Sequence, residues 1–394
     1  MSGPKRATAV FVAVAALVAP VSVIAPNAIA ILMAGAAGAA IVLDAEARRF
    51  AHVPRPLVSL FAAFSALALA SLAWTLDAAE GFDGWLRVTV TAILGLALLG
   101  KARALDDAGR RRVGDALIGG FAVAAALLVV QIVSEHLWER ENSIASFWYP
   151  PETNFWALFN RSATVLVILL PLVALAAYRR YGWKAAAVLV VAGAWLTFQL
   201  NSRSAELALC IGSAAGVLAA LSGRHAPRLL AAGLAAAMLA APLAAGSAAL
   251  AEIAERHDLS VSVYHRAAIW GFSAERIAEK PLLGWGMHAA RAMPHAKETI
   301  ARGAELMPLH PHNGPLHVWL EFGLAGALLL AILAWRLGLA TAGPPLECAL
   351  RTGMLVAAFV VASISYGLWQ GWWMATLWLA GALAAAMPAA RQAE

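Results

Sequence analysis

The sequence contains few charged residues and only two cysteines. Asp, Glu, Lys and Arg together make up 13% of the 394 residues, whereas hydrophobic residues make up 62%. A soluble domain has about 25% charged and about 45–50% apolar residues, so the excess of apolar side chains must face lipid. Cys210 and Cys348 support neither a disulfide framework nor a metal-binding spacing. The chain also lacks a fixed-period repeat, a P-loop, a GxGxxG motif after a strand and a GxSxG elbow.

Long apolar runs occupy most of the chain, and about 20 such residues cross a bilayer as a helix. They predict an all-α polytopic integral membrane protein, with about twelve transmembrane helices near 8–24, 28–43, 57–76, 85–100, 114–134, 156–177, 185–199, 205–221, 228–250, 314–335, 353–368 and 370–388. The first run is similar to a secretory signal. Since a second apolar run follows at once, we expect an uncleaved helix.

Cations predict the orientation of these helices, because cytoplasmic loops are rich in Lys and Arg. Every second loop is basic, at Lys5 and Arg6, Arg48, Arg49 and Arg55, Lys101 to Arg112, Arg179 to Lys184, Arg224 and Arg228, and Arg336 and Arg351. We therefore expect these loops and both termini to be cytoplasmic. The alternate loops, such as 77–84 and 135–155, should face outward. The net charge of +6 is then a topology signal and does not indicate nucleic-acid binding.

One large segment outside the membrane, at 251–313, separates helices 1–9 (1–250) from helices 10–12 (314–394). Residues 261–279 have apolar side chains at helical spacing, and a second helix is expected over 288–303. About 60 residues are too few for an independent enzyme domain. We expect this segment to lie on the bundle as an amphipathic cap, so that the three parts form one functional unit.

The stretch HPHNGPLHVWLEFGLAG, residues 310–326, should start the tenth transmembrane helix. Asn313 is a good N-cap, and Pro315 is tolerated in a first helical turn. The positive end of the helix dipole disfavours an imidazolium at His312, and a neutral imidazole can act as a general base. His317 and Glu321 are i,i+4 partners that can share a hydrogen bond.

Three arginines are expected on the same outer side. Arg203, in NSRSAELAL, begins a helix where the dipole repels a cation but favours an anion. Arg266, in YHRAAIW, and Arg161, in NRSATV, offer two further guanidinium groups. Membrane anchoring by snorkelling explains any one of them, but the three together beside His312 favour a phosphate site.

A phosphate site at the outer interface, with a base beside it, indicates glycosyl transfer from a polyprenyl-pyrophosphate sugar. A single displacement would invert the anomeric centre, and the arginines would stabilise the leaving pyrophosphate without a metal or other cofactor. Two alternatives stay open at this point. His310, His312, His317 and Glu321 could ligate a divalent metal, although the spacing is a loose match, or the stretch could be an inert polar loop.

The chain resembles the superfamily of O-antigen ligases and O-antigen polymerases. The motifs that carry the resemblance are PHNGPLHVWLEFGLAG, RAAIWGFSAERIAEKPLLGWG and NSRSAELAL, which together cover roughly residues 200–335. The resemblance implies a GT-C-like membrane glycosyltransferase of the bacterial inner membrane with a periplasmic active site. It also implies that Arg203 and Arg266 bind the donor pyrophosphate, that Arg161 is a weaker counterpart, and that His312 is the essential histidine.

Within this superfamily a ligase moves an undecaprenyl-linked glycan onto lipid A–core, and a polymerase moves it onto another lipid-linked repeat. One long outer loop favours the ligase, since a pair of equivalent arginine-rich outer loops is not visible. A protein O-oligosaccharyltransferase usually has a larger C-terminal part. The non-enzyme alternative is a proton-coupled transporter with His312 and Glu321 as the relay, which broken spans would favour.

Overall fold

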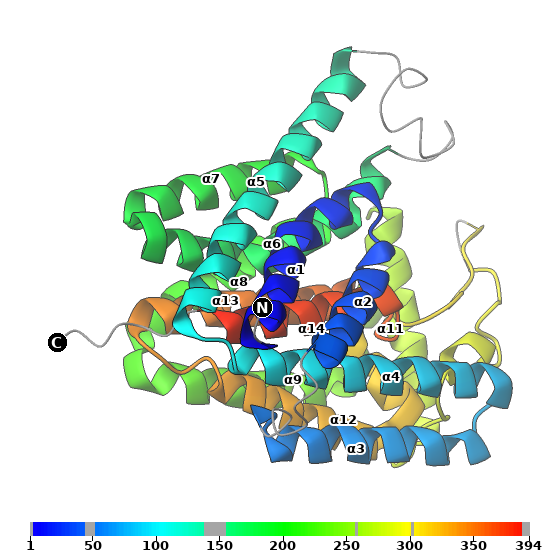
Figure 1. Ribbon diagram of the computed structural model, residues 1–394. Coiled ribbons are helices and arrows are strands. Elements are labelled where there is room, and N and C mark those ends of the chain that lie inside the picture. Colours follow the sequence, from blue (N-terminus) through cyan, green and yellow to red (C-terminus); the bar gives the residue numbers. More distant parts are fainter. Residues whose placement is uncertain (1–2, 44–51, 138–154, 257–258, 301–302, 388–394) are drawn as a thin grey trace.

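The structure is a computed structural model that describes residues 3–43, 52–137, 155–256, 259–300 and 303–387, and these are helical with no strand. Arg48, Arg49 and most of the expected outer loop 135–155 lie outside the described residues, as do the side chains of Lys5 and Arg6. The α-helices, coloured along the chain in Figure 1, are α1 (Gly3–Ile24), α2 (Ala28–Leu43), α3 (Arg55–Ala70), α4 (Ala78–Arg103), α5 (Asp107–Leu137), α6 (Phe155–Tyr181), α7 (Trp183–Gln199), α8 (Arg203–Ser222), α9 (Ala226–Ala245), α10 (Ala248–Glu255), α11 (Val261–Glu279), α12 (Gly314–Leu339), α13 (Pro345–Ile364) and α14 (Gly371–Ala386).

Each of the twelve expected spans overlaps one of the helices α1–α9 and α12–α14, although the span 228–250 runs past the end of α9 into α10. Helix α11 lies outside the expected spans. Eight described segments are long and apolar enough to cross a membrane, one of which covers both α8 and α9. The helices α2, α7 and α14 are apolar but shorter. The prediction of a polytopic all-α membrane protein is thus supported, while the count of twelve crossings stays a prediction.

The expected span 353–368 is misplaced. Helix α13 begins at Pro345, with Pro344 as its N-cap, and ends at Ile364, because the backbone of Ser365 (φ −126°, ψ −71°) is no longer helical. The hydropathy pattern alone does not reveal this end, since the apolar residues continue almost without a gap into α14. The six residues 365–370 therefore form a turn between two helices rather than the end of a span.

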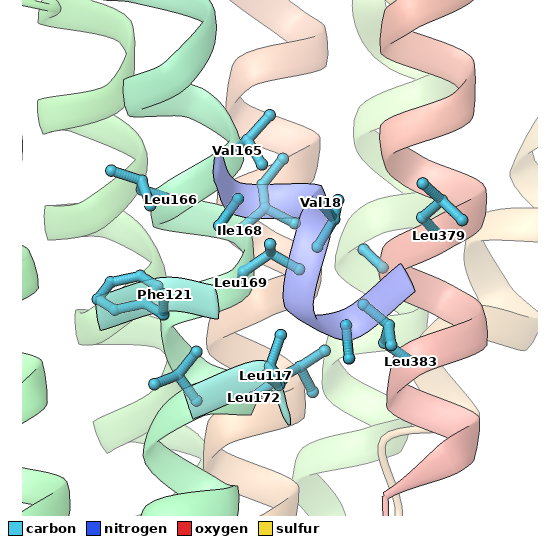
Figure 2. Close-up of a cluster of buried hydrophobic side chains, with 14 of the residues drawn as sticks. Val18, Leu117, Phe121, Val165, Leu166, Ile168, Leu169, Leu172, Leu379 and Leu383 are labelled. Carbon is cyan, nitrogen blue, oxygen red and sulfur yellow. The ribbon is translucent and has the colours of Figure 1, made fainter. Parts of the chain in front are cut away.

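Helix α6 lies at the centre of the bundle. Within its apolar stretch 83% of residues are buried, compared with 56% in the corresponding stretch of α1 and less in the other long helices. Figure 2 shows Leu166, Ile168 and Leu169 of α6 beside Val18 of α1 and Leu117 of α5. A helix that is apolar on all sides belongs in such a core, and it gives the surrounding helices a fixed support.

The two ends of the helix bundle differ in their polar contacts. At the end that we call the histidine end, Arg161 donates a hydrogen bond to Asn27 (2.7 Å), and Thr75 donates to the carbonyl of Met287 (2.7 Å). Residues 310–313 lie at this end and lead into α12. At the opposite end, Arg179 pairs with Glu347. In Figure 1 the histidine end carries the yellow segment.

The segment between α9 and α12 contains the expected helix over 261–279, which is α11. The second helix expected over 288–303 is wrong. Residues 289–292 form a short 3₁₀ turn, and Thr299 and Glu305 make an isolated bridge. Pro294 cannot donate a helical hydrogen bond, and His288 and His295 have positive φ angles of 59° and 65°, which a right-handed helix does not contain.

Helix α12 is broken inside its apolar stretch. Gly323 has φ 56° and ψ −151°, a conformation that favours glycine. The preceding segment supplies the missing hydrogen bonds: the N–H groups of Trp285 and Gly286 donate to the carbonyls of Leu320 and Glu321, and those of Leu324 and Ala325 donate to Pro281 and Leu282. The PLLGWG sequence therefore acts as a backbone partner for the break.

Candidate active site

The start of α12 has the predicted geometry. The side chain of Asn313 accepts a hydrogen bond from the Leu316 N–H (3.0 Å), and Pro315 lies in the first turn. His312, just before the cap, has φ 53°. This left-handed region is uncommon for most residues but enriched for His and Asn. The backbone therefore turns sharply just before the first turn of α12.

A backbone carbonyl fixes the tautomer of His312. Its Nδ1 lies 2.5 Å from the carbonyl oxygen of Ser365, and because a carbonyl only accepts, Nδ1 must carry the hydrogen. In the neutral ring Nε2 is then an acceptor, and it has no hydrogen-bond partner among the described residues. Burial lowers the pKa of His312, although the bond to Ser365 opposes this and Arg266 adds to it. A neutral imidazole with a free Nε2 can accept a proton.

The predicted bond between His317 and Glu321 is present, with His317 Nε2 at 3.0 Å from Glu321 Oε1. The other carboxylate oxygen accepts from Trp369 Nε1 (2.7 Å), and the Leu368 N–H lies 3.4 Å from His317 Nδ1. Glu321 is fully buried. A buried carboxylate requires such partners, so this network holds the turn 365–370 against α12.

His310 packs against His312. It is buried, its ring centroid is 4.3 Å from that of His312, and its Nδ1 accepts from the His312 backbone N–H (3.2 Å). Burial, reinforced by its histidine neighbours, lowers the pKa of His310 to about 2, so the ring is neutral. Across the part of the chain that the structure describes, no group of three or more His, Cys, Asp or Glu side chains is placed to hold a metal ion.

Arg266 projects from α11 near His312. Its guanidinium donates to the side chain of Ser262 and to the Ser262 carbonyl (3.2 Å), while its Nε is buried without a partner. Burial lowers its pKa, and Tyr366 opposes this. Arg266 also acts electrostatically on His312. The side chain is therefore close to His312 and keeps donors that no described carboxylate satisfies.

Arg161 reaches the same place from α6. It donates to Asn27 Oδ1 (2.7 Å), and its guanidinium lies over the ring of Trp372, 5.3 Å from the centroid. Like Arg266, it favours the charged form of Tyr366, although burial dominates and raises the pKa of that tyrosine. The first two turns of α6 and the start of α14 thus place Arg161 close to Tyr366.

The turn Ser365–Tyr366 is the part of the site that sequence reasoning missed. Ser365 accepts from His312 through its carbonyl, and its hydroxyl is 3.4 Å from that of Ser204. The hydroxyl of Tyr366 is 3.3 Å from that of Thr164. This turn therefore joins α6, α8 and α12. The sequence offered only a weak signal for this turn, namely Ser365, Gly367 and Gln370 within an otherwise apolar stretch.

Arg203 occupies the rim of this arrangement. It is the first residue of α8, next to Ser204, and its side chain is 86% exposed. It pairs with Glu206 (2.9 Å) within the first turn. Ser202, in the N-cap position, makes no capping hydrogen bond, and its buried hydroxyl has no partner. The structure thus gathers His312, Arg266 and Arg161 around Tyr366 and leaves Arg203 open to solvent beside them.

A known protein family matches the part of the chain that contains most of this site. Residues 165–331 match the family model described as O-antigen ligase. This stretch is an O-antigen ligase family domain. It includes Arg203, Arg266 and His312, whereas Arg161 and the Ser365–Tyr366 turn lie outside the matched residues of the O-antigen ligase model.

Relatives described as polysaccharide ligases support the same assignment to the O-antigen ligase family. A protein of Rickettsia felis is 24% identical over 324 residues, which cover 80% of this chain and 77% of that protein. Proteins of Rickettsia conorii and Rickettsia bellii are 31% and 34% identical over 125 residues. The chain spans about 30% of the length of these two relatives. The family and these relatives indicate a ligase- or polymerase-type function in polysaccharide assembly.

Proposed function

We propose that this protein is an O-antigen ligase that transfers a glycan from undecaprenyl pyrophosphate to a sugar hydroxyl of lipid A–core. In this proposal residues 1–250, 251–313 and 314–394 act as one unit in the bacterial inner membrane. Both termini are cytoplasmic, and the histidine end faces the periplasm. The helical, apolar chain and the family match support a membrane enzyme that acts on lipid-linked polysaccharide.

The convergence of His312, Arg266 and Arg161 on the Ser365–Tyr366 turn is the observation that carries the proposal. A pyrophosphate leaving group gains negative charge as its bond to the sugar breaks. Guanidinium groups bind phosphate oxygens through paired N–H donors, and donors fixed before the reaction stabilise that charge best. Arg266 and Arg161 are fixed by Ser262 and Asn27, and Arg203 would bind from the rim.

The transfer then needs one base. The acceptor hydroxyl oxygen attacks the anomeric carbon from the face opposite the pyrophosphate, and the carbon–oxygen bond to pyrophosphate breaks. The hydroxyl proton moves to Nε2 of His312, because Nδ1 already donates to Ser365. One displacement inverts the anomeric centre. Asn313, His317 and Glu321 position this imidazole by capping α12 and holding the 365–370 turn.

Two alternative functions share parts of this geometry. A polymerase would use the same donor and the same base with another lipid-linked repeat as the acceptor. A proton-coupled transporter is favoured by a broken span, and α12 is broken at Gly323. However, the backbone groups at this break are hydrogen-bonded to residues 281–286. The relative that covers most of this chain is described as a polysaccharide ligase, not as a transporter. Glycan transfer is therefore the better-supported function.

Replacement of His312 by Ala tests the proposal. Loss of a general base lowers turnover by about 10²–10⁴-fold, so cells that lack their own ligase and express the variant should make almost no glycan-capped lipopolysaccharide on a gel. His295→Ala is the matched control, because His295 is exposed and, among the described residues, pairs with Glu298 alone. Full capping by a normally expressed His312→Ala protein would refute the assignment of the base.

The pH dependence gives a second readout for the same residue. Protonated His312 cannot accept a proton, so turnover should rise with pH through its pKa. Burial lowers that pKa below the ordinary value of about 6.5, and the rising limb should therefore lie in acid, with a plateau by about pH 7. The Ala variant should lack this limb. A limb that persists in the variant would assign the titration to another group.

A further inference from the structure

A groove on the side of the bundle is not used by the site described above. It has a volume of about 430 Å³ and lies between α2, α4 and α14. Small residues line it on α2 and α14, namely Ala30, Ala34, Gly371 and Ala375. Such residues leave room for a chain of methylene groups, and the neighbouring Met33, Val90 and Leu94 make the walls apolar.

Two charged residues line the groove on α4. Asp83 and Arg87 are four residues apart and exposed. In the part of the chain that the structure describes, Arg87 makes neither an ion pair nor a hydrogen bond, with Asp83 or with any other group. An unpaired arginine within an apolar span is by default a functional residue. Its guanidinium is free to bind a phosphate, and the Asp83 carboxylate is free to accept from sugar hydroxyls.

The groove runs from this charged pair to an apolar bottom. Asp83 and Leu94 are separated by about 16 Å along the helix, at about 1.5 Å per residue. The next residue, Gly95, packs so closely on Trp378 that a Cβ there would lie 2.0 Å from the ring. Trp378 therefore lies directly against α4 beyond Leu94. A polar head at the Asp83–Arg87 end and one apolar tail toward Leu94 fit this arrangement, with the head toward the histidine end.

The charged end of the groove adjoins the proposed active site. Gly371 lines the groove, and the preceding residue, Gln370, lies 3.4 Å from His310 through its side-chain nitrogen. The following residue, Trp372, lies under Arg161. The start of α14 thus separates the groove from the arginines that would bind the donor. A transfer between two lipid-anchored substrates needs two such places, one on each side of the base.

We propose that this groove binds the acceptor of the reaction, a glycolipid with a phosphorylated sugar in its head group, with Arg87 on the phosphate, Asp83 on the sugar hydroxyls and an acyl chain between α2, α4 and α14. This inference rests on the proposed function and names the second substrate site for it. The pairing of one cation with one carboxylate suits a phosphorylated sugar better than a simple anion, which Asp83 would repel.

Direct capture of the lipid tests the groove without any turnover. A photoreactive p-benzoylphenylalanine at Leu86, which lines the groove, should cross-link to purified phosphorylated lipid A–core in nanodiscs that contain the full chain. Addition of Arg87→Ala should lower the cross-link yield at least about tenfold, as expected for a lost charged hydrogen bond. Phosphatase treatment of the glycolipid should lower the cross-link yield of the protein with Arg87 by the same factor. The proteins with and without Arg87→Ala should then give equal yields. Equal yields from both proteins with the phosphorylated lipid would overturn the proposal.

Kinetics supply the second readout. Arg87→Ala should raise the KM for phosphorylated lipid A–core about tenfold or more, with kcat and the KM for the donor unchanged, and Arg87→Lys should restore part of the loss. Arg224→Ala, an exposed arginine near the start of α9 at the opposite end, is the matched control. A raised donor KM would instead place Arg87 with the donor. If no variant transfers glycan at all, the proposed function fails, and the cross-link still decides whether the groove binds the lipid.

Discussion

The two ends of the helix bundle use arginine in different ways. At the opposite end Arg179 and Arg351 share the buried carboxylate of Glu347, and Arg180 pairs with Asp115 at 3.3 Å. Arg110 donates to the carbonyls of Leu105, Arg103, Ala385 and Met387. These guanidinium groups bind carboxylates or helix C-termini, where cations are favoured, so they hold helices together. Only Nη1 of Arg179 is buried without a partner among these described groups.

At the histidine end Arg161 and Arg266 are held by an amide, a hydroxyl and a carbonyl. No carboxylate among the described residues lies within ion-pair distance of either. Of the three predicted site arginines, only the exposed Arg203 has such a partner, which is Glu206. A neutral partner positions a guanidinium without neutralising its charge. On the proposed function, the partner of an arginine, more than the number of arginines, distinguishes the anion site from a structural contact.

The largest expected effect comes from removing both neutral-partner arginines. The double variant Arg161→Ala, Arg266→Ala should lose at least about 100-fold in glycan transfer, since each charged hydrogen bond to a phosphate contributes about 1.5–3 kcal/mol. Melting in detergent should change little, because neither side chain loses an ionic partner. Turnover can be followed with a lipid-linked glycan donor. Wild-type turnover in a folded double variant would show that the pyrophosphate binds elsewhere.

A smaller effect, on stability, is expected at the opposite end. Arg179→Ala removes one of the two partners of Glu347, while Arg351 still pairs with it at 3.0 Å. The loss of a charged hydrogen bond of this kind should cost about 1–3 kcal/mol of unfolding free energy. Thermal unfolding in detergent measures it. Transfer per folded molecule should stay unchanged, and a large loss of turnover in the folded variant would erase the distinction between the two ends.

Within the histidine end, His317→Ala should matter less than His312→Ala. His317 bonds to Glu321 and the turn 365–370, so its loss loosens the support of the base without removing a proton acceptor. We expect a loss of less than about tenfold in turnover, below the range typical of a general base, with the acid limb of the pH profile retained. Loss of that limb would transfer the role of base to His317.

The smallest expected effect is that of chelation. On the proposed mechanism the arginines stabilise the leaving group, so EDTA should leave transfer unchanged in the absence of added divalent ions. The assay needs only the purified protein, donor and acceptor. Abolition by EDTA, with recovery in one particular metal, would favour the ligand role of His310, His312 and His317 and weaken the contrast between the two ends.

Local chemistry predicted the parts of the site that depend on neighbouring residues. The cap at Asn313, the pair His317–Glu321 and the helix over 261–279 all follow from spacing within one turn or one helix. The turn 365–370 could not be predicted in this way, because its role comes from contacts with helices far away in the sequence. The helix expected over 288–303 is absent because Pro294 cannot donate a helical hydrogen bond and His288 and His295 have positive φ angles.

The break at Gly323 also bears on how the protein is made. In a bilayer each unsatisfied backbone group costs several kcal/mol, and the break leaves four groups without a partner inside α12. Those partners belong to Pro281–Gly286, a segment that leaves the ribosome before α12 does. The broken helix therefore meets its backbone partners as it enters the membrane. A permuted chain in which residues 281–286 were synthesised last would have to insert α12 with those four groups exposed to lipid.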